Sequence, residues 1–144
     1  NYLLTVDELR SYFQGVFRLL KPEGLFIFDV NSYYKLRWVQ GNNAFVFEDE
    51  DVFCVMDNEF DEAQKTSHMY LTFFIREGEM YRRYDEEHQE RAYTDDEIRD
   101  QLAAAGLEVV KVLDEYETEV VKPETERIVY VVRRKSQLTS EVGE

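Results

Sequence analysis

The segment from residue 19 to residue 31, LLKPEGLFIFDVN, constrains the fold of this chain more than any other. Residues 21–24 form a turn, because Pro22 presets its own φ and Gly24 supplies a free backbone position. The apolar run that begins at Leu25 predicts a short strand of the kind that a parallel sheet covers on both faces. The strand ends on Asp29 and Asn31, and polar residues at that end lie where open α/β sheets bind ligands.

Two capping boxes mark the starts of two helices. In each, a Thr hydroxyl and a Glu carboxylate three residues later satisfy backbone amides, first at Thr5 and Glu8 and again at Thr94 and Glu97. Apolar residues at helical spacing then define one face of a helix that runs to residue 20: Leu9, Phe13, Val16, Phe17 and Leu20. In the second helix the apolar stripe is Ile98, Leu102 and Ala105, and Gly106 marks its end.

The rest of the chain is typical of strands. Residues 31–43 have no clear period, which predicts a loop or a short helix. From Ala44 to Tyr93 apolar residues alternate with others, which predicts an antiparallel meander of three or four strands, with Cys54 as a small core residue. Leu107–Leu113 and Ile128–Val132 predict two further strands.

Composition excludes several classes of protein. Apolar residues make up 44% of the chain and aromatic residues 15%, which excludes a disordered chain. The net charge of −14 opposes binding to nucleic acid or to an anionic membrane, and no apolar run is long enough to span a bilayer. A single cysteine fits a reducing cytoplasm. Because the first residue is Asn, we expect a processed chain or a fragment.

A metal site is not expected. Residues 48–62 hold eight acidic residues and no basic one, but a calcium loop that starts at Asp57 would need Gly at its sixth position and Glu at its twelfth. Those positions are Glu62 and His68, so a solvated acidic face is the better interpretation.

The helix, the K-P-x-G turn, the apolar strand and its terminal Asp resemble one passage of class I S-adenosylmethionine-dependent methyltransferases, from the fourth helix to the fifth strand. The sequence QLAAAGLEVV at 101–110 resembles that family's entry to strand six, and EHQERAYT at 87–94 is similar to bacterial small-molecule methyltransferases. The resemblance implies an α/β fold: the C-terminal half of a Rossmann-like methyltransferase sheet, with strands in the order 5, 7, 6 and flanking helices, plus an inserted antiparallel β-meander. Residues 1–43 and 94–135 would form the half-domain, 44–93 a meander that caps the substrate, and 136–144 a flexible tail.

The resemblance also implies an activity, the transfer of a methyl group from S-adenosyl-L-methionine to N or O of a small molecule. The family's glycine-rich loop has no counterpart here, because the six glycines are scattered and form no G-x-G. We therefore expect a C-terminal fragment that is inactive alone, with the cofactor bound mainly by the rest of the parent enzyme and no cofactor-binding residue assigned in this chain.

Seven residues are candidates for the site. Polar and aromatic side chains near the strand's end would bind substrate: Asn1, Tyr2, Asp29, Asn31 and Tyr33. Each has an alternative role. Asp29 and Asn31 could form an Asx turn at the end of the strand, and Asn1 and Tyr2 could be loose terminal residues. Tyr33 could pack in the core together with Tyr34 and Trp38. His88 could accept a proton and Arg91 could hold a carboxylate, although three residues apart on a strand they point to opposite faces.

Two further expectations concern partners. A rival function is a non-catalytic binding or assembly module that uses the acidic meander to contact another protein. In the family, the strand at 25–30 pairs on one side with strand four, which this chain lacks. The resulting free edge of an apolar strand predicts a homodimer.

Overall fold

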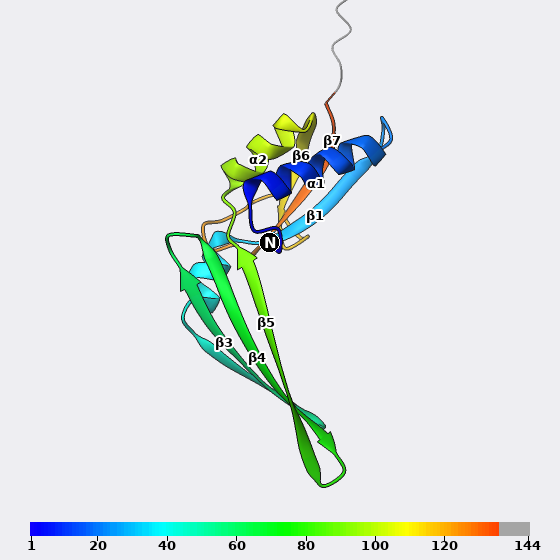
Figure 1. Ribbon diagram of the computed structural model, residues 1–144. Helices are drawn as coiled ribbons and strands as arrows, with labels where there is room; N and C mark the ends of the chain where they lie inside the picture. The colour runs from blue at the N-terminus through cyan, green and yellow to red at the C-terminus, as the bar shows by residue number, and fades with distance from the viewer. Residues whose placement is uncertain (136–144) are drawn as a thin grey trace, which may run out of the picture.

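The computed structural model describes residues 1–135, and the predicted tail at 136–144 lies outside the described residues. Figure 1 shows a body of helices and strands from which a long sheet projects. The elements follow in the order α1 (Val6–Leu19), β1 (Leu25–Asn31), the π-helix η1 (Lys35–Gln40), β2 (Ala44–Asp49), β3 (Val52–Asp61), β4 (Thr66–Glu77), β5 (Met80–Arg91), α2 (Asp95–Ala104), β6 (Leu107–Asp114) and β7 (Arg127–Arg134).

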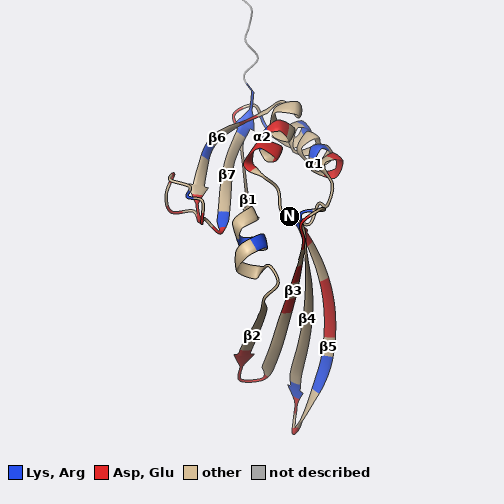
Figure 2. Ribbon diagram, turned by 90° about the vertical axis from the view of Figure 1, so that its left-hand side faces the viewer, with Lys and Arg blue, Asp and Glu red and all other residues tan. Residues whose placement is uncertain are grey.

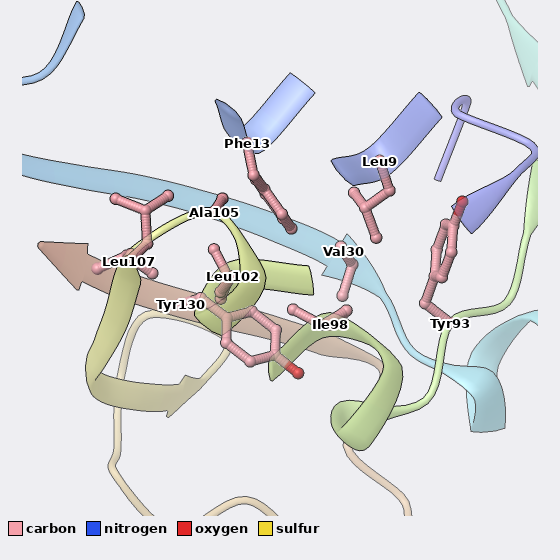
Figure 3. Packing of buried hydrophobic residues seen from close by; sticks show 10 residues of the cluster. Leu9, Phe13, Val30, Tyr93, Ile98, Leu102, Ala105, Leu107 and Tyr130 are labelled. Atoms are coloured by element: carbon pink, nitrogen blue, oxygen red, sulfur yellow. The ribbon is translucent and has the colours of Figure 1, made fainter. Parts of the chain in front are cut away.

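The body is a three-stranded sheet with strand order β1-β7-β6, and both neighbouring pairs are antiparallel. This order is the predicted 5, 7, 6 arrangement, in which the last strand lies between the other two. Helices α1 and α2 pack on the same face of the sheet, where the Phe13 side chain meets Leu102 and Tyr130 in one apolar cluster (Figure 3). The Phe28 and Tyr130 rings stack there with centroids 5.1 Å apart.

Both predicted capping boxes are present. The Thr5 and Thr94 hydroxyls accept hydrogen bonds from the Glu8 and Glu97 amides, and each Glu carboxylate accepts a hydrogen bond from the amide of its Thr. Gly106 follows α2 with φ +80°, a left-handed conformation that favours glycine. The sequence therefore defined both helix starts and the end of the second helix.

The prediction that β1 is covered on both faces is wrong for the described residues. Phe26, Phe28 and Val30 face the helices, but the alternate residues Leu25 and Ile27 are 57% and 56% exposed. An apolar run does not reveal how many layers cover it, and both α-helices of residues 1–135 lie on the same side. Strand β1 is also an edge strand, because within this part of the chain it pairs with β7 alone.

The predicted meander is a four-stranded antiparallel sheet, with strand order β2-β3-β4-β5. It projects from the carboxyl end of β1, and Figure 2 shows a long acidic section on its outer strand β5. Cys54 is buried as predicted, whereas Trp38 is 62% exposed on η1 and does not take the core position expected for it. No helix within residues 1–135 is long and apolar enough to cross a bilayer.

Candidate functional site

A cavity of about 270 Å³ lies at the carboxyl end of β1, where α1, α2 and the N-terminal segment meet. Its walls are mostly apolar, and five of the residues that line it have polar side chains: Asn1, Tyr2, Tyr12, Asp29 and Tyr93. A mostly apolar pocket with a few polar groups is typical of small-molecule sites. Three of the five residues predicted to bind substrate therefore line one cavity.

Asn1 joins β1 to β5 at the edge of this cavity. Its side-chain Nδ2 donates to the carbonyl oxygens of Asn31 at 2.9 Å and of Arg91 at 3.0 Å, while its Oδ1 accepts from the Asn31 amide at 2.8 Å. The Arg91 amide also donates to the Asn1 carbonyl oxygen at 2.9 Å. Asn1 is thus held by four hydrogen bonds, and the alternative of a loose terminal residue is wrong.

Asn31 contacts a buried carboxylate that sequence reasoning missed. Its Nδ2 donates to Glu90 Oε2 at 2.8 Å, and Glu90 is only 6% exposed. Ser67, the cross-strand neighbour of Glu90, is also buried. The Ser67 Oγ and the Asn31 Oδ1 have no hydrogen-bond partner within the described residues. Buried polar atoms without partners call for an explanation, and a polar ligand or water would satisfy them. No local pattern singles out Glu90, because most of β5 is exposed on both faces.

His88 and Arg91 do not converge, as the strand period predicted. The His88 ring contacts Tyr2, whose hydroxyl oxygen lies 3.3 Å from His88 Nδ1, and its Nε2 lies 3.2 Å from Glu86. The Arg91 guanidinium instead donates to the Leu4 carbonyl oxygen at 3.3 Å and forms an ion pair with Glu97. The two predicted catalytic residues therefore cannot act together on one atom.

Asp29 is held by two partners. Its Oδ1 accepts from Arg127 at 2.9 Å, and its Oδ2 accepts from the Tyr116 hydroxyl. That hydrogen bond, followed by burial and the charge of Asp29, raises the pKa of Tyr116. The Asp29 and Asn31 side chains thus bind other segments of the chain, and within residues 1–135 neither closes the Asx turn offered as their alternative.

Tyr33 lies apart from the cavity. Its ring packs edge-on against Phe60 with centroids 5.8 Å apart, beside Leu36 and Ala92, and its hydroxyl donates to Glu62 at 3.3 Å. Burial, and then the charge of Glu62, raise its pKa. The packing alternative therefore describes Tyr33 better than a place in this cavity.

Tyr93 is the second residue that sequence reasoning missed. Its hydroxyl lies 2.6 Å from the Leu3 carbonyl oxygen and 3.0 Å from that of Thr5, so it fixes the segment that precedes α1 (Figure 3). Burial raises the pKa of Tyr93 to about 12, so the side chain stays a neutral hydrogen-bond donor near neutral pH. Tyr93 could have been found from its place at the exit of the meander.

The described residues do not form a cradle for the whole of S-adenosylmethionine. The three glycines with positive φ lie in separate places: Gly41 ends η1, Gly78 turns the β4–β5 hairpin, and Gly106 follows α2. A glycine-rich loop that binds a cofactor needs them together in one turn. Within residues 1–135 no cluster of potential metal ligands is found either.

Comparisons with known proteins agree with the fold. No protein-family model matches the chain. It is 30% identical over 141 residues to YqeM of Bacillus subtilis, a protein named as a candidate methyltransferase, and covers 57% of that protein. It is 43% identical to an S-adenosylmethionine-dependent methyltransferase of known structure from Clostridium acetobutylicum, with a TM-score of 0.88 and 55% of that chain covered.

The resemblance to class I S-adenosylmethionine-dependent methyltransferases is thereby confirmed. The chain spans about half the length of the curated relatives that it matches. A methyltransferase from Streptomyces caelestis has the same fold, with a TM-score of 0.76 at 21% identity. The predicted half of a methyltransferase sheet, with its inserted meander, is thus what these solved structures contain.

Proposed function

We propose that the chain is the part of an S-adenosylmethionine-dependent methyltransferase that binds the methyl acceptor, an N or O atom of a small molecule. One observation carries the proposal: the cavity at the carboxyl end of β1 occurs in a chain of which 94% superposes on such an enzyme. Because the relatives are nearly twice as long, the cofactor would be held mainly by residues outside this chain.

In this proposal the apolar walls of the cavity bind the carbon skeleton of the acceptor and exclude water. Asp29 and the neutral Tyr93 orient polar groups of the acceptor. His88, which contacts the cavity residue Tyr2, accepts the proton that the acceptor atom loses. A general base has to lie within hydrogen-bond reach of the proton, and the contact between His88 and Tyr2 supports that placement. Glu90 would position Asn31 at the end of β1, next to the β1 residues that line the cavity, without touching the acceptor.

Two fold neighbours have titles that name polar acceptors. One is titled a sugar N-methyltransferase from Streptoalloteichus and the other an amino pentose methyltransferase from Micromonospora. Their identities to this chain are 20% and 16%, so for this chain they support the fold, and the acceptor remains our proposal. We also infer a cytoplasmic location, since Cys54 is the chain's single cysteine and forms no internal disulfide.

Calorimetric titration with S-adenosylmethionine tests this proposal. A longer form that includes the additional residues of the relatives should bind the cofactor and transfer its methyl group, whereas residues 1–144 alone should bind it weakly or not at all. In the longer form, His88→Gln should lower turnover without lowering the melting temperature, and Arg82→Gln, on the exposed part of the same strand, serves as its control. Absence of cofactor binding by the longer form would refute the proposal.

A further inference from the structure

We propose that a second cleft, on the other face of β5, binds the oxyanion of a small phosphorylated or carboxylated molecule. The cleft has a volume of about 430 Å³ and lies between the N-terminal segment, the β3–β4 turn and the end of β5. Lys65 and Arg91 reach it together with His68 and Gln89. This inference rests on the charges of the cleft and does not depend on methyl transfer.

The residues that line the cleft include two cations and no carboxylate. Arg91 Nη2 lies 3.1 Å and Lys65 Nζ 3.6 Å from the same oxygen of Glu97, so two cations share one carboxylate. The Arg91 Nε has no acceptor within residues 1–135, and the Lys65 ammonium is only partly neutralised. In a chain with a net charge of −14, such an excess of cations is the exception. An oxyanion is the ligand that it favours.

The neighbouring carboxylates are occupied by the backbone. Glu8 accepts hydrogen bonds from the amides of Leu4 and Thr5, which border the cleft. Asp61 accepts from two amides of the β3–β4 turn. Glu59 faces His68 across the β3–β4 pair and lines a neighbouring cleft with it, and it is not among the residues that line this cleft. The cationic side of the cleft therefore stays available to a ligand.

Contacts within the chain fix the Lys65 backbone and the Arg91 guanidinium before any ligand binds. Lys65 adopts a left-handed conformation with φ +53°, and its carbonyl oxygen accepts from the Ala92 amide at 2.8 Å. The Arg91 guanidinium lies over the Tyr93 ring, 4.9 Å from its centroid. Positions that are fixed in advance lower the entropy cost of binding.

Calorimetric titration of residues 1–144 with pyrophosphate and, separately, with citrate tests the proposal and distinguishes phosphate from carboxylate ligands. We expect at least one of the two anions to bind. Lys65→Asn, which suits the left-handed backbone, should weaken that binding about tenfold, which corresponds to about 1.4 kcal/mol. Glu97→Gln should instead tighten it, because the change removes the competing carboxylate and retains a side chain that can cap α2.

Lys111→Asn is the matched control. Lys111 is also a lysine paired with one carboxylate, Glu119, but it lies on β6 outside the cleft, so its replacement should leave anion binding unchanged. The opposite signs expected for the Lys65 and Glu97 variants separate a binding role from a structural one, since loss of structure would weaken binding in both. Absence of binding for both anions, equal weakening by Lys111→Asn, or weaker binding by Glu97→Gln would each overturn the proposal.

Discussion

Replacement of Glu97 by Ala should destabilise the chain more than the same replacement of Glu8. Both residues are the third residue of a helix and close a capping box with a Thr. Glu97 additionally pairs with Arg91, whose side chain is only 19% exposed, and with Lys65. The two sites therefore share the capping geometry and differ in the ion pairs.

The expected loss for Glu97→Ala follows from these contacts. The capping interaction contributes about 1 kcal/mol, and a hydrogen bond to a charged group contributes about 1.5–3 kcal/mol when it is shielded from water. Lys65 is 39% exposed, so water screens its share and we add nothing for it. The free energy of unfolding should thus fall by about 2.5–4 kcal/mol, a large part of the roughly 5–15 kcal/mol that a domain has.

Acid should remove the difference in unfolding free energy between wild type and Glu97→Ala. Burial by itself would raise the pKa of Glu97, but the Thr94 amide and the charges of Lys65 and Arg91 outweigh it, so the pKa is lower than usual. A carboxyl group with a lowered folded pKa stabilises the protein above its unfolded value, here 4.5, and loses that contribution as the pH falls through the folded pKa. The gap between wild type and Glu97→Ala should be full at pH 7 and should close below pH 4.5.

Urea unfolding followed by circular dichroism at pH 7 and pH 3.5 measures both effects. Similar losses for Glu97→Ala and Glu8→Ala at pH 7 would show that the pairing with Arg91 and Lys65 contributes nothing. A gap that stays constant into acid would refute the assignment of the lowered pKa to those contacts.

Three further predictions concern the core, the N-terminal segment and the free edge. Phe13→Ala should cost about 3–5 kcal/mol in urea unfolding, because its ring is 1% exposed, whereas Tyr12→Ala, at 50% exposure, should cost far less. Tyr93→Phe should cost about 1 kcal/mol and increase hydrogen exchange in residues 3–5. Because the folded pKa of Tyr93 is raised, the contribution of its neutral form is present below pH 10 and is lost as the pH rises to about 12, so wild type and variant should converge there. Residues 1–144 should form dimers through the free edge and exposed apolar face of β1, and sedimentation that gives a 17.3 kDa monomer at high concentration would contradict this.

Local patterns account for most of the fold that could be predicted. The two capping boxes, the period-two alternation of residues 44–93 and the turn before Leu25 depend on neighbours within a few residues, so the sequence contains the whole of their cause. The order of β1, β7 and β6 was predicted by resemblance to a family, since no local pattern in these strands says which will be neighbours.

The candidate site was only partly predictable. Asp29 and Asn31 could be chosen because they end a strand, and the strand period already separated His88 from Arg91. Glu90 and Tyr93 were missed because their roles depend on groups far away in sequence: Asn31 lies 59 residues from Glu90, and the Leu3 carbonyl lies 90 residues from Tyr93. A charged residue on a strand gives no local indication that it will be buried.

The sequence by itself determined where the two α-helices begin, which residues alternate on the meander, and that the chain is acidic. Only the tertiary structure decided that both helices cover one face of β1, that Asn1 joins β1 to β5, and that Lys65 and Arg91 share Glu97. The physical reason is the range of the forces involved. Hydrogen bonds along a helix or turn connect near neighbours in sequence, whereas burial and charge depend on every segment that packs nearby.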